Sequence, residues 1–195
     1  MRFESQSIIR KTAIVDPAAS IDDLRELLRI DVEEYPDQSI LDRLLTVATE
    51  YAMTYLRASL MLTDWQMALT PKQGYTGLAV ESSQERPIKL PYGPVERVVR
   101  VYREDEEGDE WPISYSVNLK KDPAEVRIKD YTADMVVIEY EAGYGETIDR
   151  VPSAIQQGIL QMAGYLYENR TCSLEDAGKL SGAWAIWGPF RRELI

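Results

Sequence analysis

Carboxylates are the side chains of this 195-residue chain whose number and grouping could do chemistry. They occur in pairs and runs: Asp22 with Asp23, Glu33 with Glu34, and the stretch REDEEGDE at 103–110. Two carboxylates held apart in a dry cleft can catalyse glycosyl or phosphoryl chemistry, and clustered carboxylates can hold a hard divalent cation. Here the acids fall in expected loops and first helical turns, where they are normally solvated, and 103–110 lacks EF-hand spacing. We therefore expect no catalytic residue and no metal ligand, and keep a carboxylate-based metal-dependent hydrolase as the enzymatic alternative.

Other routes to catalysis are closed by composition. The chain contains no histidine, so Ser-His-Asp and Cys-His nucleophiles and ordinary zinc ligation are unavailable. Its single cysteine, Cys172, permits no internal disulfide and no cysteine cluster. The glycines of GYGE at 143–146 do not belong to a phosphate-binding loop, because neither GxGxxG nor GxxxxGK[ST] occurs. The sequence predicts a protein that is not an enzyme and has no cofactor.

Charge and hydropathy restrict the partners. With 33 acidic against 22 basic residues, the net charge is −11, so a broad surface of this chain repels phosphate backbones. DNA near the protein should pass by without specific binding. No apolar run approaches the ~20 residues of a membrane span, and the first ten residues lack the apolar centre of a signal peptide. We expect no membrane partner and a product that stays in the compartment where it is made.

Apolar side chains at three- and four-residue spacing predict two helices in the N-terminal part. The first begins at Ser20, a suitable N-cap, and carries Ile21, Leu24, Leu27 and Leu28 on one face. The second begins at Asp37 or Ser39 and runs to near Ser59. Its apolar face contains Ile40, Leu41, Leu44, Leu45, Ala48, Tyr51, Ala52, Tyr55 and Leu56.

A third helix begins near Pro152 or Ser153, after two glycines that end a strand-like run. Its apolar stripe contains Ile155, Ile159, Met162, Ala163 and Leu166. We expect this stripe to pack on the second helix. The glycines Gly143 and Gly145 are then a joint between sheet and helix.

The sequence between residues 62 and 145 is typical of a small antiparallel β module. Short β-branched and aromatic runs alternate with Gly, Pro, Asp and Asn. The acidic stretch around Gly108 is expected to be a solvated hairpin tip. The expected core residues are Val99, Val101, Val126, Ile128, Val136 and Ile138.

The C-terminal segment is unusually aromatic for a chain end. Trp184, Trp187 and Phe190 lie within seven positions and are followed by Arg191 and Arg192. Such side chains must be buried, either against their own domain or in another subunit. Three glycines in the segment favour the second alternative, an arm that orders on binding.

These elements define an α+β fold: a helical bundle with an inserted antiparallel β module and an extended C-terminal arm. The expected parts are 1–61 (N-terminal arm and bundle helices), 62–145 (β module), 146–172 (bundle helix) and 173–195 (C-terminal arm).

The order of these parts resembles the head–tail connector (adaptor) family of long-tailed bacteriophages and gene transfer agents, over roughly residues 20–192. The segments that carry the resemblance are LPYGPVERV at 90–98 and YEAGYGETIDRVPSAIQQGILQMAGYLYENR at 140–170. It implies a structural virion protein of viral assembly and DNA packaging, found at the virion neck and, during assembly, in the host cytoplasm.

The resemblance also implies partners. Family members form an oligomeric ring, expected to be dodecameric, beneath the portal protein, and DNA passes through its channel. A stopper or tail-completion protein binds the opposite side, and being such a protein is the alternative role for this chain. The implied portal-binding residues are Trp184, Trp187, Phe190, Arg191 and Arg192 of the 173–195 arm.

Overall fold

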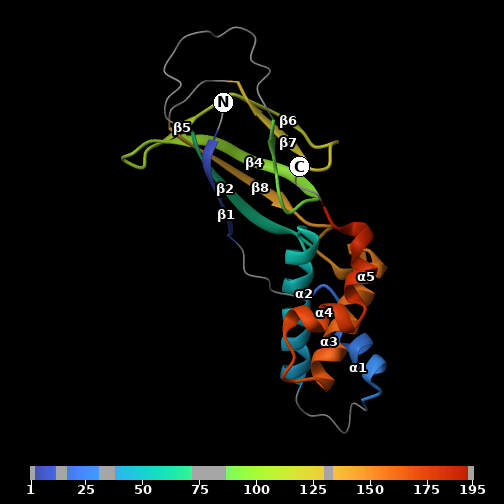
Figure 1. Cartoon of the computed structure of the whole chain (residues 1–195). Helices are drawn as coiled ribbons and strands as arrows, with labels where there is room; N and C mark the ends of the chain where they lie inside the picture. The colour runs from blue at the N-terminus through green and yellow to red at the C-terminus, as the bar shows by residue number, and fades with distance from the viewer. Residues whose placement is uncertain (1–2, 12–16, 31–37, 72–86, 130–133, 193–195) are drawn as a thin grey trace. The chain divides into compact units, whose positions relative to one another are not determined.

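The chain forms two compact units (Figure 1). The computed structural model describes residues 3–11, 17–30, 38–71, 87–129 and 134–192. The β unit comprises residues 1–13 and 63–142, and the helical unit comprises residues 14–62 and 143–193. The presence of helices and antiparallel sheets confirms the α+β class.

The β unit contains two antiparallel sheets. The larger sheet has the strand order β1-β2-β8-β4-β5 and the smaller has the order β3-β7-β6. The strands are β1 (Phe3–Arg10), β2 (Thr63–Pro71), β3 (Ile88–Lys89), β4 (Val95–Glu104), β5 (Glu110–Pro112), β6 (Tyr115–Asn118), β7 (Glu125–Ile128) and β8 (Met135–Ala142).

Alternation of side chains gives the larger sheet one apolar face and one polar face. In β2, Trp65, Met67 and Leu69 are buried, whereas Gln66 and Ala68 between them are partly exposed and the flanking Asp64 and Thr70 are exposed. Of the six predicted core residues, Val101, Val126, Ile128, Val136 and Ile138 are buried as expected.

The prediction for Val99 is wrong, because its side chain is 48% exposed. The pairing of β4 with β8 shifts register between Val98 and Arg100. A bulge of this kind adds one residue to a strand and breaks the two-residue alternation from which Val99 was placed in the core.

The PYGP segment at 91–94 packs against aromatic side chains of the β unit. Tyr92 stacks on Trp65 with a centroid separation of 4.1 Å. The Tyr140 hydroxyl donates a buried hydrogen bond of 2.7 Å to the Pro91 carbonyl. The loop therefore fixes two core aromatics that come from β2 and β8.

The helical unit is arranged around one helix, α3, which contacts α1, α2, α4 and α5 in the described part of the chain. The expected packing of α2 on α3 is confirmed. The elements are α1 (Ile21–Leu28), α2 (Gln38–Leu56), the 3-10 turn η1 (Ile148–Arg150), α3 (Ser153–Glu168), α4 (Leu174–Leu180), α5 (Ala183–Trp187) and the 3-10 turn η2 (Gly188–Phe190).

The helix limits follow local chemistry. Ser20 caps α1 as predicted, accepting a hydrogen bond of 3.1 Å from the Asp22 amide. The second helix begins at Gln38, and the proposed cap Asp37 lies outside the described residues. Pro152 occupies the N-cap position of α3, and Ser153 is its first residue.

The glycines of GYGE serve chain geometry. A Cβ on Gly143 would lie 2.5 Å from the Met61 carbonyl carbon, so only glycine allows this approach. The neighbouring backbone is tied by hydrogen bonds from Tyr144 to Leu60 and from Leu62 to Gly145. The interpretation of this segment as a joint is consistent with that geometry.

Two expectations about the ends of the chain need correction. The first residues of the expected 1–61 part do not form an arm beside the bundle helices: β1 pairs with β2 as the edge of the larger sheet. The C-terminal arm is not extended, because α4, α5 and η2 occupy residues 174–190 within the helical unit. The packing of Trp187 on α3 holds this segment on the helical unit.

Candidate interaction surfaces

Trp187 holds the C-terminal segment on its own unit. Its side chain is fully buried, and its indole N–H donates a hydrogen bond of 3.1 Å to the Ile155 carbonyl. The ring lies over Gly158 of α3, where an added Cβ would come within 2.7 Å of the indole Cε2. The missing side chain at Gly158 makes the space that the tryptophan fills, so this residue cannot contact a partner in the folded unit.

Trp184 is half-buried and forms a second aromatic contact. It stacks on Tyr55 of α2 with centroids 5.0 Å apart, and Gly178 of α4 lies against its ring. The Lys179 ammonium group lies 5.0 Å from the Trp184 centroid. Burial raises the pKa of the adjacent Tyr51, opposed by its interaction with the Trp184 indole N–H.

The remaining predicted partner-binding residues lie at the end of this packed segment. Phe190 is half-buried, and Arg191 is exposed with its guanidinium carbon 5.2 Å above the Tyr55 ring. The Arg192 amide donates a hydrogen bond of 3.1 Å to the Leu56 carbonyl. The structure thus brings all five residues into one region but withdraws Trp187 from its surface.

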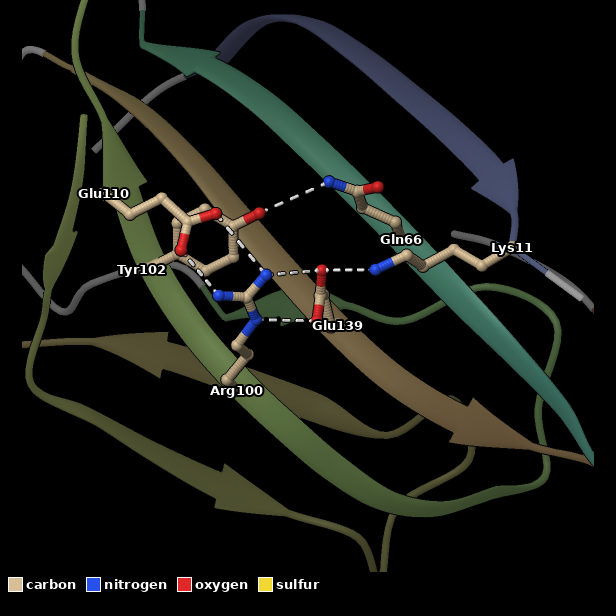
Figure 2. Close-up of polar contacts among 6 residues, drawn as sticks. All are labelled: Lys11, Gln66, Arg100, Tyr102, Glu110 and Glu139. Carbon is tan, nitrogen blue, oxygen red and sulfur yellow. Dashed lines mark hydrogen bonds and ion pairs between the residues drawn. The ribbon is translucent and has the colours of Figure 1, made fainter. Parts of the chain in front are cut away.

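The polar face of the larger sheet carries an ion-pair network that the sequence did not predict (Figure 2). The Glu139 carboxylate accepts hydrogen bonds from Arg100 Nε at 2.7 Å and from Lys11 Nζ at 2.7 Å. Arg100 also bonds Glu110 through Nη1 at 2.6 Å. Side chains from β4, β5, β8 and the residue after β1 are joined in this way.

Aromatic and amide groups complete the network. Tyr102 lies under the Arg100 guanidinium, with 4.3 Å between the guanidinium carbon and the ring centroid. Gln66 Nε2 approaches the Tyr102 hydroxyl at 3.4 Å. Burial is the main cause that raises the pKa of Tyr102.

The ionisation of Glu139 is fixed by this arrangement. The bidentate hydrogen bond from Arg100 lowers the pKa of Glu139 to about 2, with Lys11 acting in the same direction against burial. The same contact, with Glu110, raises the pKa of Arg100. At neutral pH this carboxylate has no proton to donate, and its low pKa and the engagement of both oxygens by Arg100 and Lys11 make it a poor proton acceptor. We therefore interpret the network as a cross-strand brace.

Among the described residues, no group of three His, Cys, Asp or Glu side chains is placed to hold a metal ion. No described helix has the length and apolarity needed to cross a membrane. Two charged surfaces of the described residues are candidates for interaction: the end of the C-terminal segment, with Arg191, and the charged edges of the β unit.

Solved structures of gene transfer agent (GTA) particles contain chains with this α+β fold. A chain of the neck of an empty GTA particle, computed with C6 symmetry, superimposes with a TM-score of 0.73 at 19% identity, covering 97% of each chain. A chain of the native GTA neck, computed with C12 symmetry, gives 0.70 at 18% identity over 97% of each chain. A chain of the native GTA virion gives 0.72 at 18% identity over 96% of each chain. The shared fold thus extends over nearly the whole of both chains.

No protein-family model matches the chain, and no curated protein matches it in sequence.

Proposed function

We propose that this chain is a structural protein of the neck of a phage-like particle, an adaptor that forms a ring beneath the portal and joins capsid to tail. DNA passes through the ring, and the protein carries out no catalysis. The observation that carries the proposal is the fold shared with GTA neck chains over 97% of their length.

Two further features support this proposal. The sequence segments that resemble the adaptor family, at 90–98 and 140–170, correspond to the PYGP segment of the β unit and to the joint with α3. The net charge of −11 also suits a ring whose wall repels the phosphate backbone, so that DNA slides through the channel without binding.

The proposal is tested by removing the protein from its particle. Without it, we expect DNA-filled heads and free tails to accumulate unjoined, and the purified protein should then bind directly to portal-bearing heads that lack every other neck protein. Binding only after another neck protein has been added would contradict the adaptor role and favour a stopper or tail-completion protein. Normal tailed particles would contradict a neck function altogether.

We also propose that the end of the C-terminal segment contacts the portal. The contact surface is narrower than the sequence suggested: Phe190, Arg191 and Arg192, with the accessible part of Trp184, while Trp187 only anchors the segment. Arginine pairs in bidentate fashion with carboxylates, and aromatic and arginine side chains dominate interface energetics.

A charge reversal at Arg191 tests this contact. We expect Arg191→Glu to fold normally and to lose co-sedimentation with portal-bearing heads by at least about ten-fold, as expected for a hot-spot residue. Arg43→Glu is the matched control, because Arg43 is an exposed arginine of α2 in the same unit. Equal binding by both variants would show that the portal contact lies elsewhere.

A further inference from the structure

The hairpin tip between β4 and β5 combines an exposed aromatic side chain with concentrated negative charge. From Glu104 to Glu110 there are six acidic residues and no basic one. Trp111, directly after them, is 49% exposed and donates an indole hydrogen bond of 3.3 Å to Asp105. Asp105 also accepts hydrogen bonds from the amides of Glu107 and Asp109, which order the tip. We call residues 104–111 the acidic tip.

The smaller sheet of the same unit presents the opposite charge. In β7, Val126 and Ile128 are buried on one face, and Glu125 and Arg127 lie on the other, where Arg127 is exposed and Glu125 is covered. Glu125 is paired with Lys121 at 2.9 Å, while Arg127 keeps half of its side chain exposed and lies 3.9 Å from Glu125. The basic residues of this sheet and its turn are Lys89, Lys120, Lys121, Arg127 and Lys129, against the acids Asp122 and Glu125. We call this surface the basic face.

The two surfaces lie apart within the β unit. In Figure 1 the β4–β5 tip and the β6–β7 hairpin project to opposite sides of that unit. A closed ring with cyclic symmetry above two-fold requires a heterologous interface, in which two different surfaces of one subunit meet on neighbouring copies. The acidic tip and the basic face are two different surfaces of opposite charge, so they can meet on neighbouring copies in such an interface.

We propose that the acidic tip of one copy docks on the basic face of the next copy and so sets the ring. This inference rests on the proposed ring-forming function and names the interface. A second copy is the favoured occupant, because one chain of net charge −11 supplies both the acidic tip and the five basic residues of the small sheet and its flanking turn. Trp111 supplies the apolar anchor, and the surrounding charges supply direction and specificity.

Engineered cysteines test the contact directly. The double variant Glu107→Cys/Arg127→Cys is made in a Cys172→Ser background, which removes the chain's own cysteine. In assembled particles treated with a mild oxidant, we expect a ladder of disulfide-linked multimers on a denaturing gel. Each single-cysteine variant is the control and should give no ladder. A double variant that stays monomeric in particles whose necks contain the protein overturns this interface while leaving the proposed neck function intact.

Charge exchange tests the specificity. Glu106→Lys/Glu107→Lys reverses the tip, and Arg127→Glu/Lys129→Glu reverses the face; each is expected to reduce tailed particles by at least about ten-fold. The four substitutions in one chain should restore assembly. The matched control is Asp42→Lys/Glu146→Lys, which alters exposed acids of the helical unit and should assemble normally. Failure of the four-fold variant to recover, with intact folding of each unit, would show that the tip or the face binds a different protein.

Discussion

At the scale of single residues, Gly158 and Trp187 define how the C-terminal segment is held. An alanine at 158 would place its Cβ 2.7 Å from the indole Cε2. We expect Gly158→Ala to destabilise the helical unit by ~1–3 kcal/mol through overpacking, in spite of alanine's better helix propensity. Denaturant unfolding followed by circular dichroism measures the change.

Gly164→Ala is the control in the same helix. Its Cβ would meet Leu27 and Leu28 at 3.5 and 3.6 Å, which is ordinary contact. The higher helix propensity of alanine should leave stability unchanged or raise it by up to ~1 kcal/mol. Equal destabilisation by both substitutions would mean that the contact with Trp187 is not what requires glycine.

Glu139 predicts a pH dependence of the β unit. Its pKa is lowered to about 2 in the folded protein, chiefly by Arg100, so its ionised form stabilises the fold above the unfolded pKa of ~4.3. That contribution, at most ~3 kcal/mol, is expected to be lost as the pH falls from about 5 towards 2. Chemical unfolding at a series of pH values measures it. Glu139→Gln should flatten the curve in this window, and an unchanged slope would contradict the assignment.

At the scale of elements, α4 and α5 form part of the helical unit. Trp187→Ala is expected to cost ~3–5 kcal/mol of unfolding free energy, because it empties a fully buried site and removes the hydrogen bond to Ile155. Leu180→Ala in the same segment is the control, since Leu180 is 67% exposed and its loss should stay within ~0.5 kcal/mol. Thermal unfolding of the two variants compares them, and a mild effect at Trp187 would restore the idea of a freely ordering arm.

At the scale of the whole molecule, the proposed charged interface predicts the oligomeric state of the free protein in solution. We expect a mainly monomeric protein in dilute solution, because small charged contacts associate weakly until the portal places many copies side by side. Sedimentation velocity measures this, and a stable closed ring without portal would contradict it.

The same charge of −11 predicts weak affinity for duplex DNA even at low salt. Fluorescence anisotropy with a labelled duplex is the measurement. Micromolar binding with a steep salt dependence would contradict the expectation that DNA slides through the ring without binding to it.

The sequence by itself determined the elements whose pattern is local. The spacing of Leu41, Leu45 and Leu56 predicted α2, Ser20 predicted the start of α1, and alternation around Val126 predicted strands. These signals survive because helical and strand periods are set by the backbone of each segment. They sufficed for the α+β class and for the packing of α2 on α3.

Tertiary structure alone decided where distant segments meet. The bulge that exposes Val99, the pairing of β1 with β2, and the meeting of Lys11, Arg100 and Glu139 all depend on strand register between residues far apart in the chain. The C-terminal segment shows the same limit: its composition required burial, but composition does not say against what. The missing side chain at Gly158 made the space, and the buried hydrogen bond to Ile155 satisfied the indole, so Trp187 packs within its own unit.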